Sequence, residues 1–259
     1  MKRTPLSDSP APEYLGKIPG DLLFFDMETL PTEDPQVIQM LADKVLPPGN
    51  MKKEDTIAAW ERDEKPGLVL DAVSKTSFDG AYGRVCCVSW AFGDKPVEGL
   101  IGEEVDVLKG FLDAVRDHNL DTLFNTRAGT YSRYTPDDAK PHPLQLRVGG
   151  HNIRDFDMRF LWKRVIINKL SVPQSLPWRE GKWSERFQDT MSLWDPEKRI
   201  SLGNLCRALG IDHEEDDFDG SMVATAFKQG RHSKILRYCK ADTEAARRCW
   251  YRMMIAPLF

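Results

Sequence analysis

The chain has 259 residues, of which 41% are hydrophobic and 29% charged, so it can bury the core of one large domain or of two small ones. No apolar run approaches the roughly 20 residues that span a bilayer, and the N-terminus lacks the hydrophobic segment of a secretory signal, so we expect a cytoplasmic protein. The net charge of −4 disfavours a passive nucleic-acid coat protein, which is usually basic, but allows an enzyme with an acidic metal pocket.

Two carboxylates follow the first predicted strand. A proline-containing lead-in over residues 1–20, expected to be extended, precedes an apolar run that predicts a buried strand at about 21–27. Asp26 and Glu28 have i, i+2 spacing and so share one face, where they repel each other unless a cation lies between them. Mg²⁺ and Mn²⁺ could bind between the two carboxylates, because both cations prefer carboxylate oxygen ligands. A strand that runs out into a solvated acidic turn explains this segment equally well.

Residues 31–80 carry only weak secondary-structure signals. Short helices are predicted near 35–44 and 53–63, separated by a Pro-Pro-Gly-Asn turn. We interpret the segment as a long insertion rather than as a separate domain.

The middle of the chain predicts a hairpin, a helix and a loop. Residues 84–92 and 97–101 predict two strands joined by a Gly-Asp turn. The chain has five cysteines and no CxxC pair, so Cys86 and the others are expected to be reduced core thiols. Apolar spacing predicts an amphipathic helix over 103–117, and the glycine and prolines of 121–143 predict a mobile loop.

The second carboxylate feature follows a strand predicted at 144–149. Spacing in a helix over about 155–168 flanks Asp157 with phenylalanine side chains, which favours a metal ligand over a solvated carboxylate. The neighbouring Asp155 is expected to cap this helix. The chain from about residue 190 to 254 is predicted to be helical, and the sequence of strands and helices indicates one α/β domain.

The third feature lies in the last predicted helix. Tyr238 and Asp242 lie one turn apart on a stripe with Ile235 that should face the core. A carboxylate on that stripe needs a metal or a cationic partner, because an unpaired buried charge is costly. The alternative is a core tyrosine beside a salt bridge from Asp242 to a nearby arginine.

These three ordered motifs resemble the DEDD exonuclease family in its tyrosine-bearing branch, including the proofreading exonuclease domains of family-B DNA polymerases and their stand-alone relatives. The matching segments are Phe25-Asp26-Met27-Glu28-Thr29, His151-Asn152 through Phe156-Asp157, and Tyr238-x-x-x-Asp242. The histidine-bearing branch has a histidine five residues before the last aspartate, where this chain has Arg237. The resemblance implies a ribonuclease H-like fold, with a mixed central sheet flanked by helices. It also implies one exonuclease domain over residues 21–259 with insertions near 31–80 and 122–143.

The activity implied by the resemblance is metal-dependent 3′–5′ hydrolysis of single-stranded DNA that releases nucleoside 5′-monophosphates. Two divalent cations, Mg²⁺ or Mn²⁺, would be held by Asp26, Glu28, Asp157 and Asp242, and Tyr238 would orient the attacking water. Substrate contacts are implied for Met27, Thr29, Asn152 and Phe156. Only the polymerase-B-like spacing of the second motif favours DNA over RNA at the 3′ end. An exoribonuclease of the same branch and a non-catalytic nucleic-acid-binding module therefore remain alternatives.

Basic and aromatic residues surround the second motif. They are Arg147, Arg154, Arg159, Lys163, Arg164, Trp178, Arg179, Lys182, Trp183 and Arg186. A basic groove with aromatic platforms would suit a single strand. For the two tryptophans, packing against the protein surface is the preferred interpretation.

Overall fold

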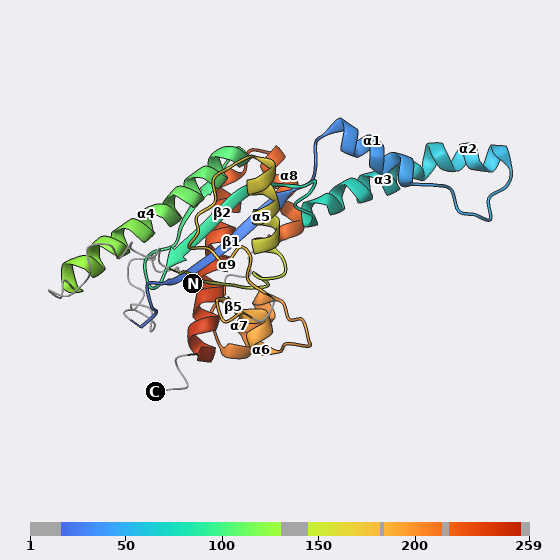
Figure 1. The fold of residues 1–259 in the computed structure, drawn as a ribbon. Helices are drawn as coiled ribbons and strands as arrows, with labels where there is room; N and C mark the ends of the chain where they lie inside the picture. The colour runs from blue at the N-terminus through green and yellow to red at the C-terminus, as the bar shows by residue number, and fades with distance from the viewer. Residues whose placement is uncertain (1–16, 131–144, 182–183, 214–217, 255–259) are drawn as a thin grey trace.

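A computed structural model describes residues 17–130, 145–181, 184–213 and 218–254 (Figure 1). The expected lead-in lies mostly outside these residues. Among the described helices, none is both long and apolar enough to cross a membrane. All five cysteines are buried and free, which confirms the expectation of core thiols.

The centre of the molecule is a five-stranded mixed sheet. Its strands are β1 (Leu22–Leu30), β2 (Arg84–Phe92), β3 (Glu98–Ile101), β4 (Arg147–Gly150) and β5 (Phe187–Asp189), in the order β3-β2-β1-β4-β5. β3, β2 and β1 are antiparallel, whereas β4 and β5 run parallel to β1. The predicted α/β class and mixed sheet are confirmed, and the arrangement is consistent with a ribonuclease H-like fold. The three-residue β5 was not predicted, because it is too short to show a pattern.

Helices cover both faces of the sheet, because β1 is apolar on both of its faces. Leu23, Phe25 and Met27 point into a core shared with α4 (Glu104–Thr130) and α5 (Asp157–Ile167). Leu22 and Phe24 point the other way, against α9 (His232–Met254). Between α5 and α9 the chain forms α6 (Thr190–Trp194), α7 (Leu202–Leu209), η3 (Gly220–Met222) and α8 (Val223–Lys228). The predicted helical C-terminal part is thus confirmed.

The insertion between β1 and β2 extends away from the sheet (Figure 1). It contains α1 (Pro35–Lys44), α2 (Glu54–Asp63), α3 (Lys65–Ser74) and the 3-10 helix η2 (Lys75–Phe78). The first two helices were predicted and the third was not. Proline is favourable in the first turn of a helix, and Pro66 lies in the first turn of α3.

The prediction of a loop over residues 121–143 is partly wrong. α4 continues to Thr130, since the first proline after its start is Pro136 and nothing before that residue forbids a helix. Residues 131–144 lie outside the described part of the chain.

Candidate active site

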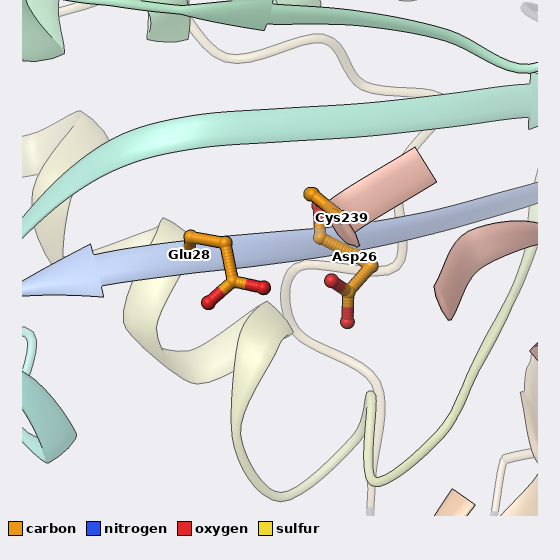
Figure 2. A group of neighbouring side chains, drawn as sticks. All are labelled: Asp26, Glu28 and Cys239. Carbon is orange, nitrogen blue, oxygen red and sulfur yellow. The ribbon is translucent and has the colours of Figure 1, made fainter. Parts of the chain in front are cut away.

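Four carboxylates from three elements share one site. β1 supplies Asp26 and Glu28, α5 begins with Asp157, and α9 carries Asp242. Asp26 is repelled by each of the other three, and Glu28 by Asp157 and Asp242. Figure 2 shows the Asp26 and Glu28 side chains on the same side of β1, as the alternation of a strand predicts. The structure therefore brings together all four residues that the motifs singled out.

The pairing of β1 with its neighbours positions Asp157. β1 pairs with β4 only as far as Phe24 opposite Gly149, so the backbone of Met27 has no strand partner on that side. The Asp157 carboxylate lies close to the Met27 backbone; burial has the largest effect on its pKa and raises it, whereas this interaction lowers it. The first residue of α5 is thereby joined to the strand that carries Asp26 and Glu28.

The loop before α5 is held by Asp189, which the sequence analysis did not select. This buried carboxylate accepts hydrogen bonds from the backbone N–H groups of Asn152 (3.0 Å), Arg154 (3.2 Å) and Met191 (3.0 Å). Asn152 has a φ of 60°, a left-handed conformation that asparagine tolerates better than most residues. Asp189 thus fixes a turn whose backbone is otherwise unfavourable.

His151 connects two segments of the fold. Its ring nitrogens lie 2.9 Å from Thr190 Oγ1 and 2.9 Å from the carbonyl oxygen of Ile200. It therefore joins the loop before α5 to the segment that precedes α7. Asp155 does not cap α5 as predicted, because the cap position is Phe156; it lies instead 3.2 Å from Arg154 and 3.4 Å from Arg159.

A buried hydroxyl joins α9 to the sheet beside Asp26. Ser89, the β2 residue paired with Asp26, donates a hydrogen bond to the carbonyl oxygen of Cys239 (2.8 Å), and its Oγ lies 2.6 Å from Thr243 Oγ1. The Cys239 thiol donates to the carbonyl oxygen of Asp26 (3.5 Å). These contacts fix the helix turn from Tyr238 to Asp242 over the carboxylates of β1.

Cys239 also lies among the carboxylates. Its sulfur and one carboxylate oxygen each from Asp26 and Glu28 lie within 4.8 Å of one another. Burial raises the pKa of this thiol well above its ordinary value, and the nearby carboxylates raise it further. Cys239 is therefore a neutral thiol that donates a hydrogen bond.

The surroundings of the site disfavour the charged form of three of its four carboxylates. Burial and then repulsion from the other carboxylates raise the pKa values of Asp26 and Glu28 well above the ordinary range, and burial does the same for Asp157. Burial and the carboxylates around it also raise the pKa of Tyr238, so its hydroxyl keeps its proton at neutral pH. A concentration of acidic oxygens with a shortage of positive charge fits divalent cations, which would offset the repulsion.

Asp242 has a partner that the motifs did not indicate. His213 Nε2 lies 2.9 Å from Asp242 Oδ1, and both side chains are largely buried. The salt-bridge alternative for Asp242 predicted an arginine as its partner. His213 precedes α9 by almost twenty positions, and no periodic pattern connects the two residues.

The implied substrate contacts differ in how they are placed. Met27 has its side chain in the core, so only its backbone lies near the carboxylates. Thr29 Oγ1 donates to the carbonyl oxygen of Ser77 (2.7 Å). Asn152 and Phe156 are half-buried, and Phe156 directly precedes Asp157.

The predicted basic groove does not form as a row of unpaired cations. Arg147 pairs with Asp21, Arg154 and Arg159 with Asp155, Lys163 with Asp79, Arg164 with Glu104, and Arg186 with Glu180. Asp21, Asp79 and Glu104 lie 126, 84 and 60 positions from their basic partners, so local spacing gave no sign of these three pairs. Lys182 and Trp183 lie outside the described residues.

Trp178 packs as the preferred interpretation expected. Its Nε1 donates to the carbonyl oxygen of Pro173 (2.7 Å), and its ring lies 5.3 Å from that of Trp162. Together with Arg179 and Arg186, these tryptophans line a cavity of about 510 Å³. None of the four motif carboxylates lines it.

The C-terminal part of the chain can be compared with known families. A family described as a predicted 3′–5′ exonuclease related to the exonuclease domain of PolB has a sequence model that fits residues 143–256. This part of the chain matches that exonuclease family. No curated protein matches the chain.

The matched segment runs from before β4 through most of α9 and includes Asp157, Tyr238 and Asp242. The resemblance to exonucleases of the family-B polymerase type is thereby confirmed. Asp26 and Glu28 lie before the matched segment, and the fold brings them to it through β1. The exonuclease family implies a nucleic-acid substrate for the chain.

Proposed function

We propose that this protein is a metal-dependent 3′–5′ exonuclease of the tyrosine-bearing DEDD type that acts on single-stranded DNA and releases nucleoside 5′-monophosphates. The observation that supports it is the convergence of Asp26, Glu28, Asp157 and Asp242 beside Tyr238, in a chain whose C-terminal part matches an exonuclease family. In this proposal residues 21–259 act as one domain, with the helices α1–α3 as an insertion.

The four carboxylates would hold two divalent cations, Mg²⁺ or Mn²⁺. Such cations lower the pKa of a bound water and offset the charge that develops on the phosphate. The donor set is suitable, because carboxylate oxygen is the ligand type that these cations prefer. The raised pKa values of Asp26, Glu28 and Asp157 mean that the protein alone disfavours the negative charge on these carboxylates.

Tyr238 would orient the attacking water. A phenol whose pKa is raised is a poor base at neutral pH, but it is a good hydrogen-bond donor or acceptor. Glu28 would contact the terminal 3′-hydroxyl, and Asn152 would position the strand. His213 would keep the Asp242 carboxylate in its orientation through the 2.9 Å contact.

A nuclease assay with labelled single strands tests this function. DNA and RNA of the same sequence, labelled at the 5′ or the 3′ end, are incubated with Mg²⁺, Mn²⁺ or EDTA, and Asp26→Ala is run beside the wild type. Glu61→Gln, which removes one exposed carboxylate on α2, is the matched control.

Stepwise shortening from the 3′ end that needs metal and is lost in Asp26→Ala, with a circular dichroism melt showing that the variant is folded, is the expected result. The relative rates on DNA and RNA decide between the two substrates. Binding without cleavage under every metal would overturn the proposal in favour of a non-catalytic module.

A further inference from the structure

Phe78 is an aromatic side chain that folding leaves in solvent. It ends η2 and is 73% exposed, whereas the other phenylalanines of the sheet and of α5 are mostly buried. A single exposed apolar residue needs no explanation in general. For Phe78, the position of the ring suggests an explanation for its exposure.

The segment that carries Phe78 is anchored to the end of β1. Thr29 donates through Oγ1 to the carbonyl oxygen of Ser77 (2.7 Å), and the Thr32 N–H donates to Oγ1 of the buried Thr76 (2.8 Å). Thr29 directly follows Glu28. The exposed ring is therefore held next to the strand that carries two of the site carboxylates.

The other side of the same segment packs on α5. Lys163 forms an ion pair with Asp79 (2.5 Å), and a side chain at Gly80 would meet the backbone of Phe160 at 3.0 Å. Such a close approach favours a glycine. The segment that carries Phe78 therefore contacts both the end of β1 and α5.

Three rings lead from the core to solvent. Phe160, 3% exposed, lies 5.7 Å from the half-buried Phe156, and Phe156 lies 6.4 Å from Phe78 at an angle of 55°. Phe156 directly precedes Asp157, and Phe78 is the exposed ring beyond it. A strand that passed over Phe156 on leaving the carboxylates would therefore meet Phe78 next.

We infer that Phe78 stacks on a base of the single strand, one or more nucleotides inward from the 3′-terminal residue. The inference rests on the proposed function and adds to it a substrate contact from the insertion, outside the segment that matches the exonuclease family. Aromatic side chains stack on any base, because each base has a π-face, so this contact favours unpaired strands without selecting a sequence.

The test compares two substrates with Phe78→Ala, Phe78→Trp and Leu70→Ala. Leu70 is the matched control, since it is a similarly exposed apolar residue (70%) on α3 of the same insertion. One substrate is a single-stranded oligonucleotide, and the other is the p-nitrophenyl ester of thymidine 5′-monophosphate, which has no inward base. Steady-state KM and kcat are measured for both.

Phe78→Ala is expected to raise KM for the oligonucleotide roughly 5- to 100-fold, which corresponds to the loss of one stacked base, and to leave hydrolysis of the ester unchanged. Phe78→Trp and Leu70→Ala are expected to stay within about twofold of the wild type. An abasic nucleotide at the inward position should slow the wild type but not Phe78→Ala.

Three results would overturn the inference. An unchanged oligonucleotide KM in Phe78→Ala would remove the contact, an equal loss on the ester would show a general defect, and an equal loss in Leu70→Ala would show an effect of surface hydrophobicity. A wild type that cleaves neither substrate would overturn the proposed function as well. Activity of the wild type with an unaffected Phe78→Ala would refute only the stacking.

Discussion

Replacing Asp26 by asparagine should stabilise the metal-free protein while it abolishes cleavage. The substitution keeps the size of the side chain and removes one charge from a site where three other carboxylates repel it. A site selected for folding alone would not gather these charges, so relief of the repulsion should appear as an increase in the free energy of unfolding.

The magnitude follows from the separation of the charges. One carboxylate oxygen of Asp26 and one of Glu28 lie within 4.8 Å of each other. At that separation two full charges repel by about 3 kcal/mol with an effective dielectric constant of about 20. The raised pKa values mean that protons are shared within the site, which relieves part of the repulsion. We therefore expect Asp26→Asn to gain about 1–3 kcal/mol, or about 2–10 °C in Tm.

The pH dependence has a definite sign. Asp26, Glu28 and Asp157 have higher pKa values in the folded protein than in the unfolded chain, so the folded protein binds more protons. Their contribution to stability is therefore lost as the pH rises from the unfolded-state value near 4 through the folded-state values. The slope of stability against pH should be shallower in Asp26→Asn.

The assay is thermal and urea denaturation in EDTA between pH 5 and pH 8, with Glu61→Gln as the surface-charge control. Mn²⁺ at 100 times its Kd should stabilise the wild type by about 2.7 kcal/mol and Asp26→Asn by much less. If Asp26→Asn is less stable than the wild type in EDTA, or gains no more than Glu61→Gln, the reasoning from charge repulsion is refuted.

Three further substitutions separate catalysis from support. Tyr238→Phe should lower kcat roughly tenfold or more with little change in KM, since only the water-orienting hydroxyl is removed; a change confined to KM in steady-state assays would argue against that role. Asp189→Ala should destabilise the fold by about 3 kcal/mol or more in urea denaturation, because three N–H donors lose a charged acceptor, and a stability equal to that of the wild type would contradict its role in the loop. Arg164→Ala should cost about 3–5 kcal/mol by breaking a largely buried pair with Glu104, yet leave the oligonucleotide KM of the folded enzyme unchanged; a raised KM would restore Arg164 as a substrate contact.

Local periodicity and the family resemblance together selected the four carboxylates that the fold brings close to one another, because the spacing of residues in a strand or helix shows which of them share a face. The spacing of Asp26 and Glu28 and the helical stripe of Tyr238 and Asp242 needed no knowledge of the fold. Ser89, Asp189 and His213 were missed, since each acts on a segment far away in sequence. A serine inside an apolar strand looks like an interruption until its helix partner is in place.

The interpretation of the basic residues shows the same limit of prediction from local sequence. Arg147 and Arg164 were interpreted as a basic surface, but Asp21 and Glu104 neutralise them from positions 126 and 60 residues away. The sequence shows how many charges the chain has, whereas the fold decides which of them remain available to a nucleic acid. The same holds for Phe78, whose exposure depends on how η2 is anchored.

The contact between the Cys239 thiol and the Asp26 carbonyl joins residues 213 positions apart, and the site exists only where those two ends of the fold meet. Contacts of such long range form late in folding, since the entropy of closing the chain must first be overcome. A nascent or proteolysed piece that lacks either β1 or α9 holds two of the four carboxylates or three, and never the whole set. The proposed nucleolytic activity therefore requires β1 and α9 together, and we expect it only after the complete topology has formed.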